Sequence, residues 1–205
     1  MSARAIRPTF ISWFLIAVIM CLVFSTPAYA ETTNDLMSLS KSEVSQRFQD
    51  LYDKYDPGDI ITGEDAAFIG MYAQSPSEQP KKRAEDKSKA FQQVVDKYGT
   101  KVRFNGLFYH RGTFEYTYGG DLQANVQSGP APKSMTMSVN CQSYGIVSGG
   151  YVVTHEGSVT HTASGVKSAS MNKAKKYSGL VVLYYLSATL DVTTASGNGF
   201  NVIVS

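Results

Sequence analysis

Three residues of the types found in thiol-hydrolase triads occur in the second half of this chain: Cys141, His155 and Asp191. A cysteine nucleophile works as the thiolate, so a functional triad needs its cysteine on an exposed, electropositive turn or helix start. Cys141 instead ends an alternating segment and shares a face with Met135 and Val139. Free cysteine in such a place behaves as a small hydrophobic residue. The sequence therefore predicts a buried, inert thiol, and the triad stands as the candidate catalytic set.

The histidines of the chain are the candidate metal ligands: His110, His155 and His161. His155 and His161 flank Glu156-Gly157, so a strand-turn-strand arrangement would bring the two imidazoles together. No compact ligand motif of the HExxH type is present. We therefore expect no bound metal and no cofactor.

The segment from Asp53 to Glu64 has the length of an EF-hand calcium loop. Its ends and Gly58 match that motif, but Tyr55 and Pro57 occupy two positions where oxygen-bearing side chains are required. Because calcium takes about six to eight oxygen ligands, the segment is interpreted as a turn between two helices with acids near the helix ends.

An aromatic cluster between residues 104 and 118 is the candidate binding surface. Its members are Phe104, Tyr109, Phe114, Tyr116 and Tyr118. If exposed, these rings would stack on a sugar or on a protein partner; if buried, they would form the core face of a hairpin. The residue types alone leave both interpretations open.

The first thirty residues have the pattern of a secretory signal peptide. Arg4 and Arg7 form a basic n-region, an apolar run extends from Ile11 to Phe24, and Ala28-Tyr29-Ala30 ends in the small-x-small pattern of a cleavage site. We predict cleavage after Ala30. The mature protein is then expected to be periplasmic or secreted and to meet a membrane only during export.

Removal of this leader changes the composition of the chain. The precursor carries 19 Lys and Arg against 17 Asp and Glu, and both excess charges leave with the leader, so the mature chain is formally neutral. Neutrality argues against nucleic-acid binding. The leader also contains Cys21 and the single tryptophan, Trp13. Mature protein therefore cannot form an intramolecular disulfide, and the lack of tryptophan favours a protein partner over a carbohydrate.

Helix signals dominate residues 40–98. A capping box opens the first helix at Ser40, and a shorter second helix is predicted over Ala66 to Ala73. A third helix is predicted to run to Tyr98, with Gly99 as its C′ residue.

After residue 99 the hydrophobic period changes to two, which is typical of strands. Lys101 to His110 and Thr113 to Gly119 read as a hairpin, and Met135 to Cys141 alternates with one apolar face. The predicted fold is α+β: N-terminal helices over about 40–98, packed on a C-terminal antiparallel sheet or small sandwich over about 100–205. We expect a single exported domain, 31–205, and leave open whether helices and sheet share one core.

These patterns favour an exported, non-catalytic protein-binding module, such as a periplasmic inhibitor, an immunity-type protein or an accessory protein of envelope assembly. Its expected partner is another protein in the envelope or outside the cell. The alternative is an exported hydrolase that uses Cys141 with His155, or a histidine-bound metal. A surface structural subunit is a third class.

Overall fold

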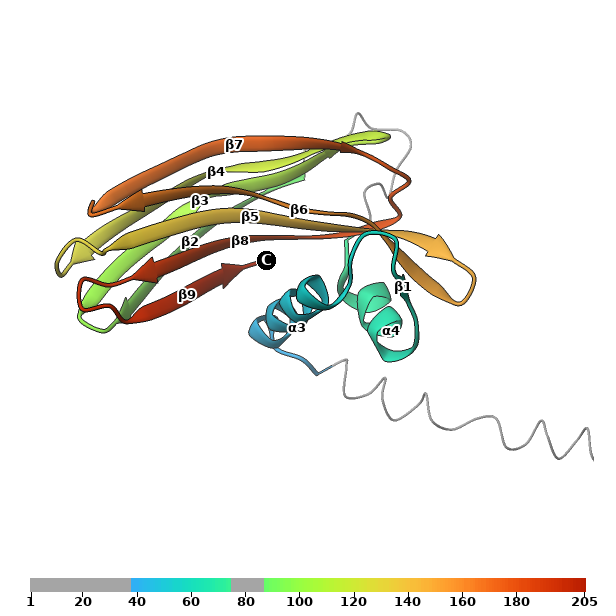
Figure 1. The fold of residues 1–205 in the computed structure, drawn as a ribbon, viewed down its shortest axis with the longest axis horizontal. Coiled ribbons are helices and arrows are strands. Elements are labelled where there is room, and N and C mark those ends of the chain that lie inside the picture. The colour runs from blue at the N-terminus through green and yellow to red at the C-terminus, as the bar shows by residue number, and fades with distance from the viewer. Residues whose placement is uncertain (1–37, 75–86) are drawn as a thin grey trace, which may run out of the picture. The chain divides into compact units, whose positions relative to one another are not determined.

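Two antiparallel β-sheets face each other in the computed structural model, which describes residues 38–74 and 87–205. The five-stranded sheet has the order β1-β6-β5-β8-β9, and the four-stranded sheet has the order β2-β3-β4-β7. The two layers of long strands are seen from the side in Figure 1. The elements in chain order are α3 (Lys41–Lys54), β1 (Ile60–Ile61), α4 (Gly63–Tyr72), β2 (Lys87–Lys97), β3 (Thr100–Gly112), β4 (Glu115–Ser128), β5 (Ser134–Val147), β6 (Gly150–Ser164), β7 (Ser168–Ser178), β8 (Leu183–Thr193) and β9 (Gly199–Val204).

The hydrophobic core lies between the two sheets, within a compact unit formed by residues 39–205. Strands β5 and β8 contribute one wall, and β3, β4 and β7 contribute the other. The alternation predicted for Met135 to Cys141 is confirmed, because the four odd-numbered side chains of this part of β5 are all fully buried. The antiparallel sandwich expected for residues 100–205 is therefore present.

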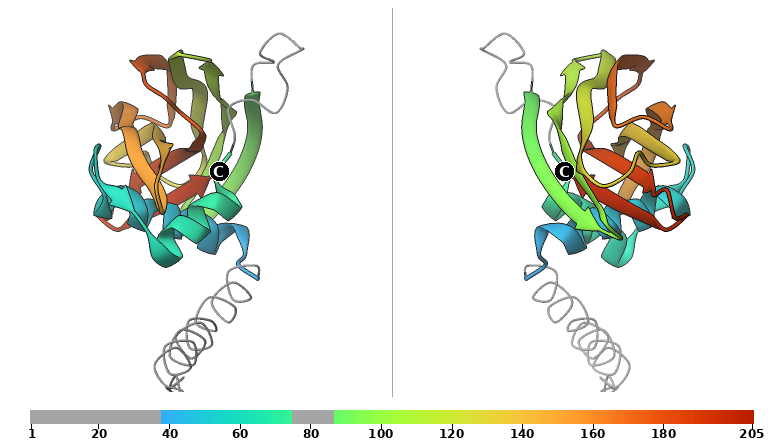
Figure 2. Two further views of the ribbon diagram at one scale, coloured as in Figure 1. Left: turned by 90° about the vertical axis from the view of Figure 1, so that its right-hand side faces the viewer. Right: turned by 90° about the vertical axis from the view of Figure 1, so that its left-hand side faces the viewer.

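The two helices pack outside this core, on the outer face of the five-stranded sheet (Figures 1 and 2). Phe48 of α3 stacks on Tyr185 of β8 with ring centroids 3.7 Å apart, and it also contacts Phe68 of α4. The capping box predicted at Ser40 is confirmed. The interpretation of residues 53–64 as a connection between two helices is also confirmed, with the short strand β1 inside it.

The third predicted helix is wrong over its described part, because residues 87–97 form strand β2. Phe91 and Val95 pack against the sandwich core, whereas Val94 is 47% exposed. The inward positions therefore follow a period of two, and pairing with β3 along the whole of β2 overrides the helical spacing. The molecule is mostly β, with two short helices among the described residues, rather than a helical half packed on a sheet. Residues 1–37, with the predicted signal peptide, and residues 75–86 lie outside the described part of the chain.

A two-residue turn, Tyr98-Gly99, joins β2 to β3. Both residues have positive φ, 52° and 72°, as a type I′ hairpin turn requires. Gly99 was predicted as a left-handed residue at the end of a helix. Its left-handed conformation is found, but it serves a hairpin.

Candidate functional site

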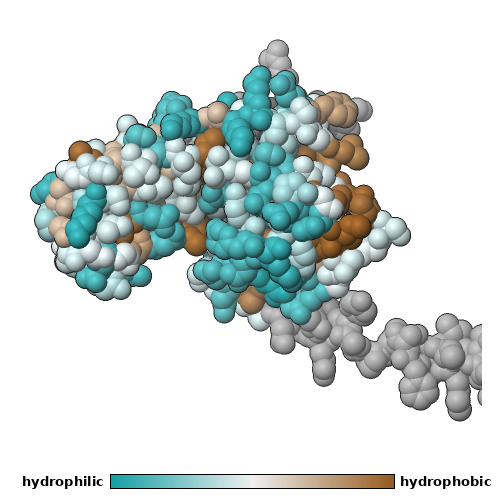
Figure 3. Space-filling model, in the orientation of Figure 1, coloured by the Kyte–Doolittle hydropathy of each residue, from teal (hydrophilic) through white to brown (hydrophobic). Residues whose placement is uncertain are grey.

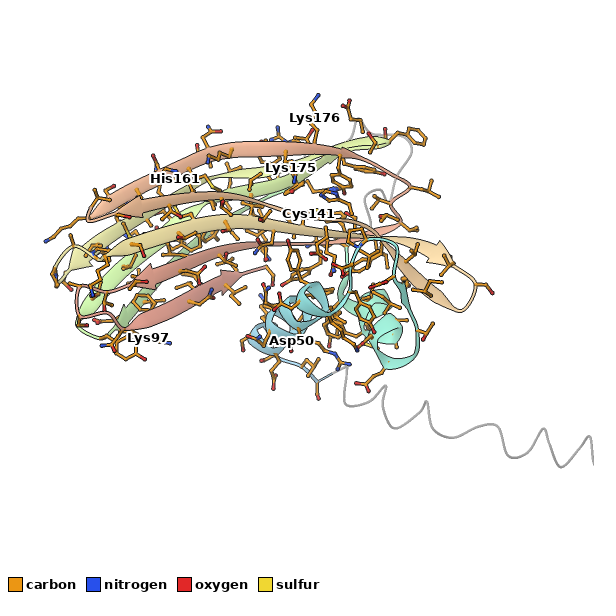
Figure 4. All side chains as sticks on the ribbon, in the orientation of Figure 1. Asp50, Lys97, Cys141, His161, Lys175 and Lys176 are labelled. Atoms are coloured by element: carbon orange, nitrogen blue, oxygen red, sulfur yellow. The ribbon has the colours of Figure 1, made fainter. Side chains whose placement is uncertain are left out.

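Cys141, the candidate nucleophile, lies on the inner face of β5 and is fully buried between the sheets (Figure 4). Its Sγ atom is 3.7 Å from the hydroxyl of Ser143. Burial raises the pKa of the thiol to about 12, because the low-dielectric core disfavours the thiolate. The thiol is protonated and enclosed at neutral pH, as the sequence predicted for a residue on an apolar strand face.

A buried hydrogen-bond network surrounds this thiol and joins the two sheets. The hydroxyl of Tyr177 on β7 is 2.6 Å from His110 Nε2 and 2.6 Å from Ser143 Oγ. Tyr177 and His110 belong to the four-stranded sheet, whereas Ser143 belongs to the five-stranded one. The network therefore links the two sheets and fixes how they are positioned relative to each other, which apolar contacts alone would specify less sharply.

Both histidines of this cluster are held between aromatic rings. His110 stacks on Tyr184 with centroids 4.0 Å apart, and His155 stacks on Tyr177 at 3.9 Å. Burial lowers the pKa of each imidazole to about 4. A smaller part of this lowering comes from the positive charge of Lys175 at His155 and from the electrostatic effect of His155 at His110. Both rings are therefore neutral at pH 7.

Two buried polar atoms of the cluster have no hydrogen-bond partner among the described residues: Tyr118 Oη and His155 Nε2. Both lie against Gly157 of β6. A Cβ atom on that glycine would be 2.6 Å from Tyr118 Oη and 3.1 Å from His155 Nε2. Glycine at position 157 therefore leaves space for the Tyr118 hydroxyl. Close packing here leaves the Tyr118 hydroxyl and His155 Nε2 buried without a hydrogen bond from the described residues, which costs stability.

Asp191, the third member of the candidate triad, lies elsewhere on the sheet. It pairs with Thr136 of β5, whereas Cys141 pairs with Leu186, five residues away along β8. At about 3.3 Å per residue this is roughly 16 Å. Asp191 is exposed, and its carboxylate accepts a hydrogen bond from Asn201 Nδ2 at 2.5 Å. The fold brings Cys141 and His155 into one cluster but leaves Asp191 outside it.

The candidate metal ligands are also divided. His110 and His155 belong to the buried cluster, but His161 is six residues farther along the same strand as His155 and pairs with Met137. That spacing corresponds to roughly 20 Å. Within the described ranges, no group of three or more His, Cys, Asp or Glu side chains converges as a metal site would require.

The five aromatic candidates for a binding surface separate into two groups. Phe104, Tyr116 and Tyr118 are buried in the core, which is the hairpin-core interpretation of the cluster. Tyr109 is half-buried, with the guanidinium of Arg111 4.0 Å above its ring. Phe114 is 76% exposed in the turn between β3 and β4, so it is fully available to a partner.

Phe114 lies beside two further exposed apolar side chains that sequence reasoning missed, Leu180 and Ile146, exposed by 74% and 65%. The Gly179 N–H donates a hydrogen bond to the Phe114 carbonyl at 3.5 Å. The Leu180 carbonyl in turn packs on Gly145, the neighbour of Ile146. The β3–β4 connection, the β7–β8 connection and the end of strand β5 therefore meet at one end of the sandwich.

Strand β1 places a further exposed apolar side chain at this end of the sandwich, on the opposite face of the five-stranded sheet from Ile146, because Ile60 lies in the row of Val152 and Gly145 whereas Ile146 lies in the row of Tyr151 and Ile61. Ile60 pairs with Val152 at the edge of β6 and is 61% exposed. We refer to Phe114, Ile146, Leu180 and Ile60 together as the apolar end. The space-filling view shows hydrophobic residues gathered at the right-hand end of the molecule, over the β5–β6 hairpin (Figure 3). The sequence could have indicated these exposed residues, because Leu180 and Ile146 each follow a glycine in or near a connection, where polar residues are usual.

A small cavity lies between β2 and β8, with Tyr184 among its lining residues. It has a volume of about 140 Å³ and is lined by Gln74, Ser88, Lys89, Phe108, Tyr184 and Leu186. Pockets for small organic ligands usually measure about 300–1,000 Å³. The exposed apolar end is therefore the stronger candidate for recognition.

Comparison with known proteins gives no matching protein-family model and no matching curated sequence. None of the helices in the described ranges is long and apolar enough to span a membrane.

Proposed function

We propose that this protein is an exported, non-catalytic protein-binding module, and that the apolar end is its binding surface. The observation that carries the proposal is that Phe114, Ile146 and Leu180, each more than half exposed, lie at one end of the sandwich, Phe114 and Leu180 in two connections and Ile146 near the end of β5. Exposed large apolar side chains gathered at one end of a protein cost solubility, and in soluble proteins such gatherings mark sites of association. Aromatic and large aliphatic side chains are also the usual anchors of protein interfaces.

The state of the buried cluster supports a non-catalytic role. The Cys141 thiol is protonated and enclosed, and the His155 imidazole is neutral. A cysteine hydrolase needs an accessible thiolate stabilised by a neighbouring cation. The contacts of this cluster are instead those of a polar core that fixes how the two sheets meet.

The expected export of the protein rests on the sequence of residues 1–30, which has the pattern of a cleaved leader. Export of the protein implies that its partner lies in the envelope or outside the cell. This part of the proposal is tested by fractionation and by mass spectrometry of the purified protein, whose first residue is then Glu31. A chain that retains residues 1–30 would contradict it.

The binding surface is tested by capturing partners on the immobilised mature protein and on two variants, Phe114→Asp and Leu180→Asp. A charge at either position introduces a desolvation penalty in the centre of the interface. The matched control is Val166→Asp, because Val166 is also an exposed apolar residue but lies in the turn between β6 and β7, at the other end of the sandwich.

We expect a captured protein to be retained by the control and lost by both apolar-end variants, with the difference reproduced when the two purified proteins are titrated. The affinity should fall by at least about tenfold. Equal binding by all four forms would contradict the proposed surface. Hydrolytic activity that disappears in a folded Cys141→Ala variant would contradict the non-catalytic role.

A further inference from the structure

We infer that Asn198 is a site of spontaneous deamidation, and that Thr194 activates it in the folded protein. The site is the turn between β8 and β9, at the left of Figure 1 and at the opposite end of β8 from Leu180. It does not depend on the apolar end or on its partner. The observations that carry it are the hydrogen bonds around one peptide group, which joins Asn198 to Gly199.

An asparagine that precedes a glycine can cyclise through its own backbone. The Gly199 nitrogen attacks Cγ of Asn198 and bonds to it, the bond from Cγ to Nδ2 breaks, and Nδ2 leaves as ammonia with the proton that the Gly199 N–H gives up. Water then opens the cyclic imide. Its attack at Cγ yields aspartate, and its attack at the backbone carbonyl carbon yields isoaspartate, whose main chain is longer by a carbon. Glycine offers this attack the least steric resistance because it lacks a Cβ atom.

The Gly199 N–H points away from β8. The Thr194 N–H donates to the Asn198 carbonyl at 2.8 Å, so these two residues form a hydrogen-bonded pair at the start of the β8–β9 ladder. The next pair, Thr193 with Gly199, is then of the non-hydrogen-bonded kind, whose N–H groups point away from the partner strand. Because β9 is the edge strand of its sheet within the described chain, this N–H faces the open edge. Residues 195–199 are all exposed.

Thr194 activates the peptide group that reacts. Its N–H at 2.8 Å and its hydroxyl at 3.0 Å both donate to the Asn198 carbonyl oxygen. When the Gly199 N–H loses its proton, negative charge spreads onto that oxygen, so two donors already in place there stabilise the attacking anion. Thr194 is 1% exposed and is therefore held in position by the fold. Lys133 adds a positive charge, since its Nζ atom is 3.4 Å from the place that a Cβ atom on Gly197 would occupy.

The same turn orients the side-chain amide of Asn198. Its Nδ2 donates to Ser196 Oγ at 3.2 Å, and Ser196 Oγ is 2.9 Å from Thr194 Oγ1. Two hydroxyls therefore connect the nitrogen that leaves with the carbonyl oxygen of the peptide group that attacks. Such a chain can transfer a proton to the departing ammonia.

The other Asn-Gly pair of the sequence, Asn105-Gly106, provides an internal control. It lies inside β3, which pairs with β2 on one side and with β4 on the other. The backbone of β4 at Asp121 also packs closely on Gly106. A peptide group held from both sides cannot turn to bring its nitrogen onto Cγ, so Asn105 should be protected while the protein is folded.

The site is tested by incubating the purified mature protein at mildly alkaline pH and following both asparagines by peptide mass spectrometry, with isoaspartate separated from aspartate by chromatography. In the folded protein we expect Asn198 to convert at least about tenfold faster than Asn105. In urea, where both segments are unfolded, the two rates should become similar. Equal protection of the two asparagines in the folded protein would overturn the site.

The role of Thr194 is tested with a matched pair of variants, Thr194→Val and Thr194→Ser, whose folding is checked by circular dichroism. Valine has a similar shape without the hydroxyl, so conversion of Asn198 should slow about fivefold, the factor expected for one lost hydrogen bond. Serine keeps the hydroxyl and should preserve the rate. In urea, where the turn is not formed, both variants should match the wild-type protein.

Ser196→Ala changes an exposed residue of the same turn, so it tests the hydroxyl chain even if Thr194→Val fails to fold. It should also slow the conversion of Asn198. Faster conversion in folded Thr194→Val would mean that the hydrogen bonds restrain the turn, and this result would overturn the activation. An unchanged rate in Ser196→Ala would overturn the proton transfer through the hydroxyls.

Discussion

The rings of His155 and Tyr177 lie parallel, with their centroids 3.9 Å apart and their planes 10° apart. His155 belongs to β6 of one sheet and Tyr177 to β7 of the other, so this stack spans the open side of the sandwich. The same tyrosine hydrogen-bonds to His110 and Ser143. Tyr177 therefore contacts both titratable imidazoles, His155 and His110, at the interface between the two sheets. We expect the stability of the fold to depend on pH for this reason.

We expect stability to fall as the pH is lowered from 7 to 4. The pKa of His110 is about 4 in the folded protein and about 6.5 when exposed, so the unfolded chain takes up protons first and its population is favoured over this interval. For His110 alone the loss amounts to about 3 kcal/mol. Urea unfolding at the two pH values measures it.

The variant His110→Phe isolates this contribution from that of the carboxylates. Phenylalanine can keep the stack on Tyr184, and the Tyr177 hydroxyl retains Ser143 as a hydrogen-bond partner. We expect a shallower pH dependence in the variant. An unchanged pH dependence would show that His110 titrates normally in the folded state.

The Cys141 thiol should react with a disulfide reagent only after the protein unfolds. Its side chain is fully buried and burial raises its pKa to about 12, so both access and thiolate formation are suppressed. The reaction rate should follow the unfolded population as urea is added. Rapid reaction of one thiol per chain in native buffer would contradict the buried placement.

Gly157 and Tyr118 should behave as a coupled pair. Gly157→Ala places a methyl group 2.6 Å from Tyr118 Oη and should cost about 1–3 kcal/mol through overpacking. Tyr118→Phe alone should be neutral or slightly stabilising, because that hydroxyl is buried without a partner among the described residues. The double variant should recover most of the loss, which a double-mutant cycle of urea unfolding would measure. Additive effects would contradict the close approach.

Replacement of Tyr98 by asparagine should stabilise the protein by about 1 kcal/mol. Tyr98 has a φ of 52° and is 60% exposed, so it bears the cost of the left-handed conformation with little packing in return. Asparagine is favoured at this position of a type I′ turn. Thermal unfolding of the two forms measures the difference, and a lower midpoint for Tyr98→Asn would indicate that the tyrosine ring contributes more through contacts than it loses through backbone strain.

Much of the sandwich was predictable because its strands alternate. In β5 the residues Met135, Met137 and Val139 are separated by polar neighbours, and a half-buried strand is the simplest structure that explains them. Strand β2 was not predictable in this way. Phe91, Val94, Val95 and Tyr98 satisfy a helical spacing, and only pairing with β3 decides which of them are buried.

The candidate site was predictable only in part. The buried character of Cys141 follows from its strand face, but its meeting with His110 and Tyr177 depends on which strands face each other across the sandwich, which a local pattern does not encode. The apolar end likewise depends on how segments far apart in the sequence are brought together by the fold. Phe114 was among the predicted binding residues, whereas Leu180 and Ile146 are recognised as its neighbours only once two connections and the end of β5 are known to meet.

Neither sheet of this sandwich is built from a continuous stretch of chain. The chain crosses from β4 to β5, returns to the other layer at β7, and crosses again to β8. Each half of the sequence therefore supplies strands to both layers, and neither half can bury its own apolar surface. A protease cut in the exposed connection at Gly129-Pro130 should leave two pieces that remain associated until the whole sandwich unfolds.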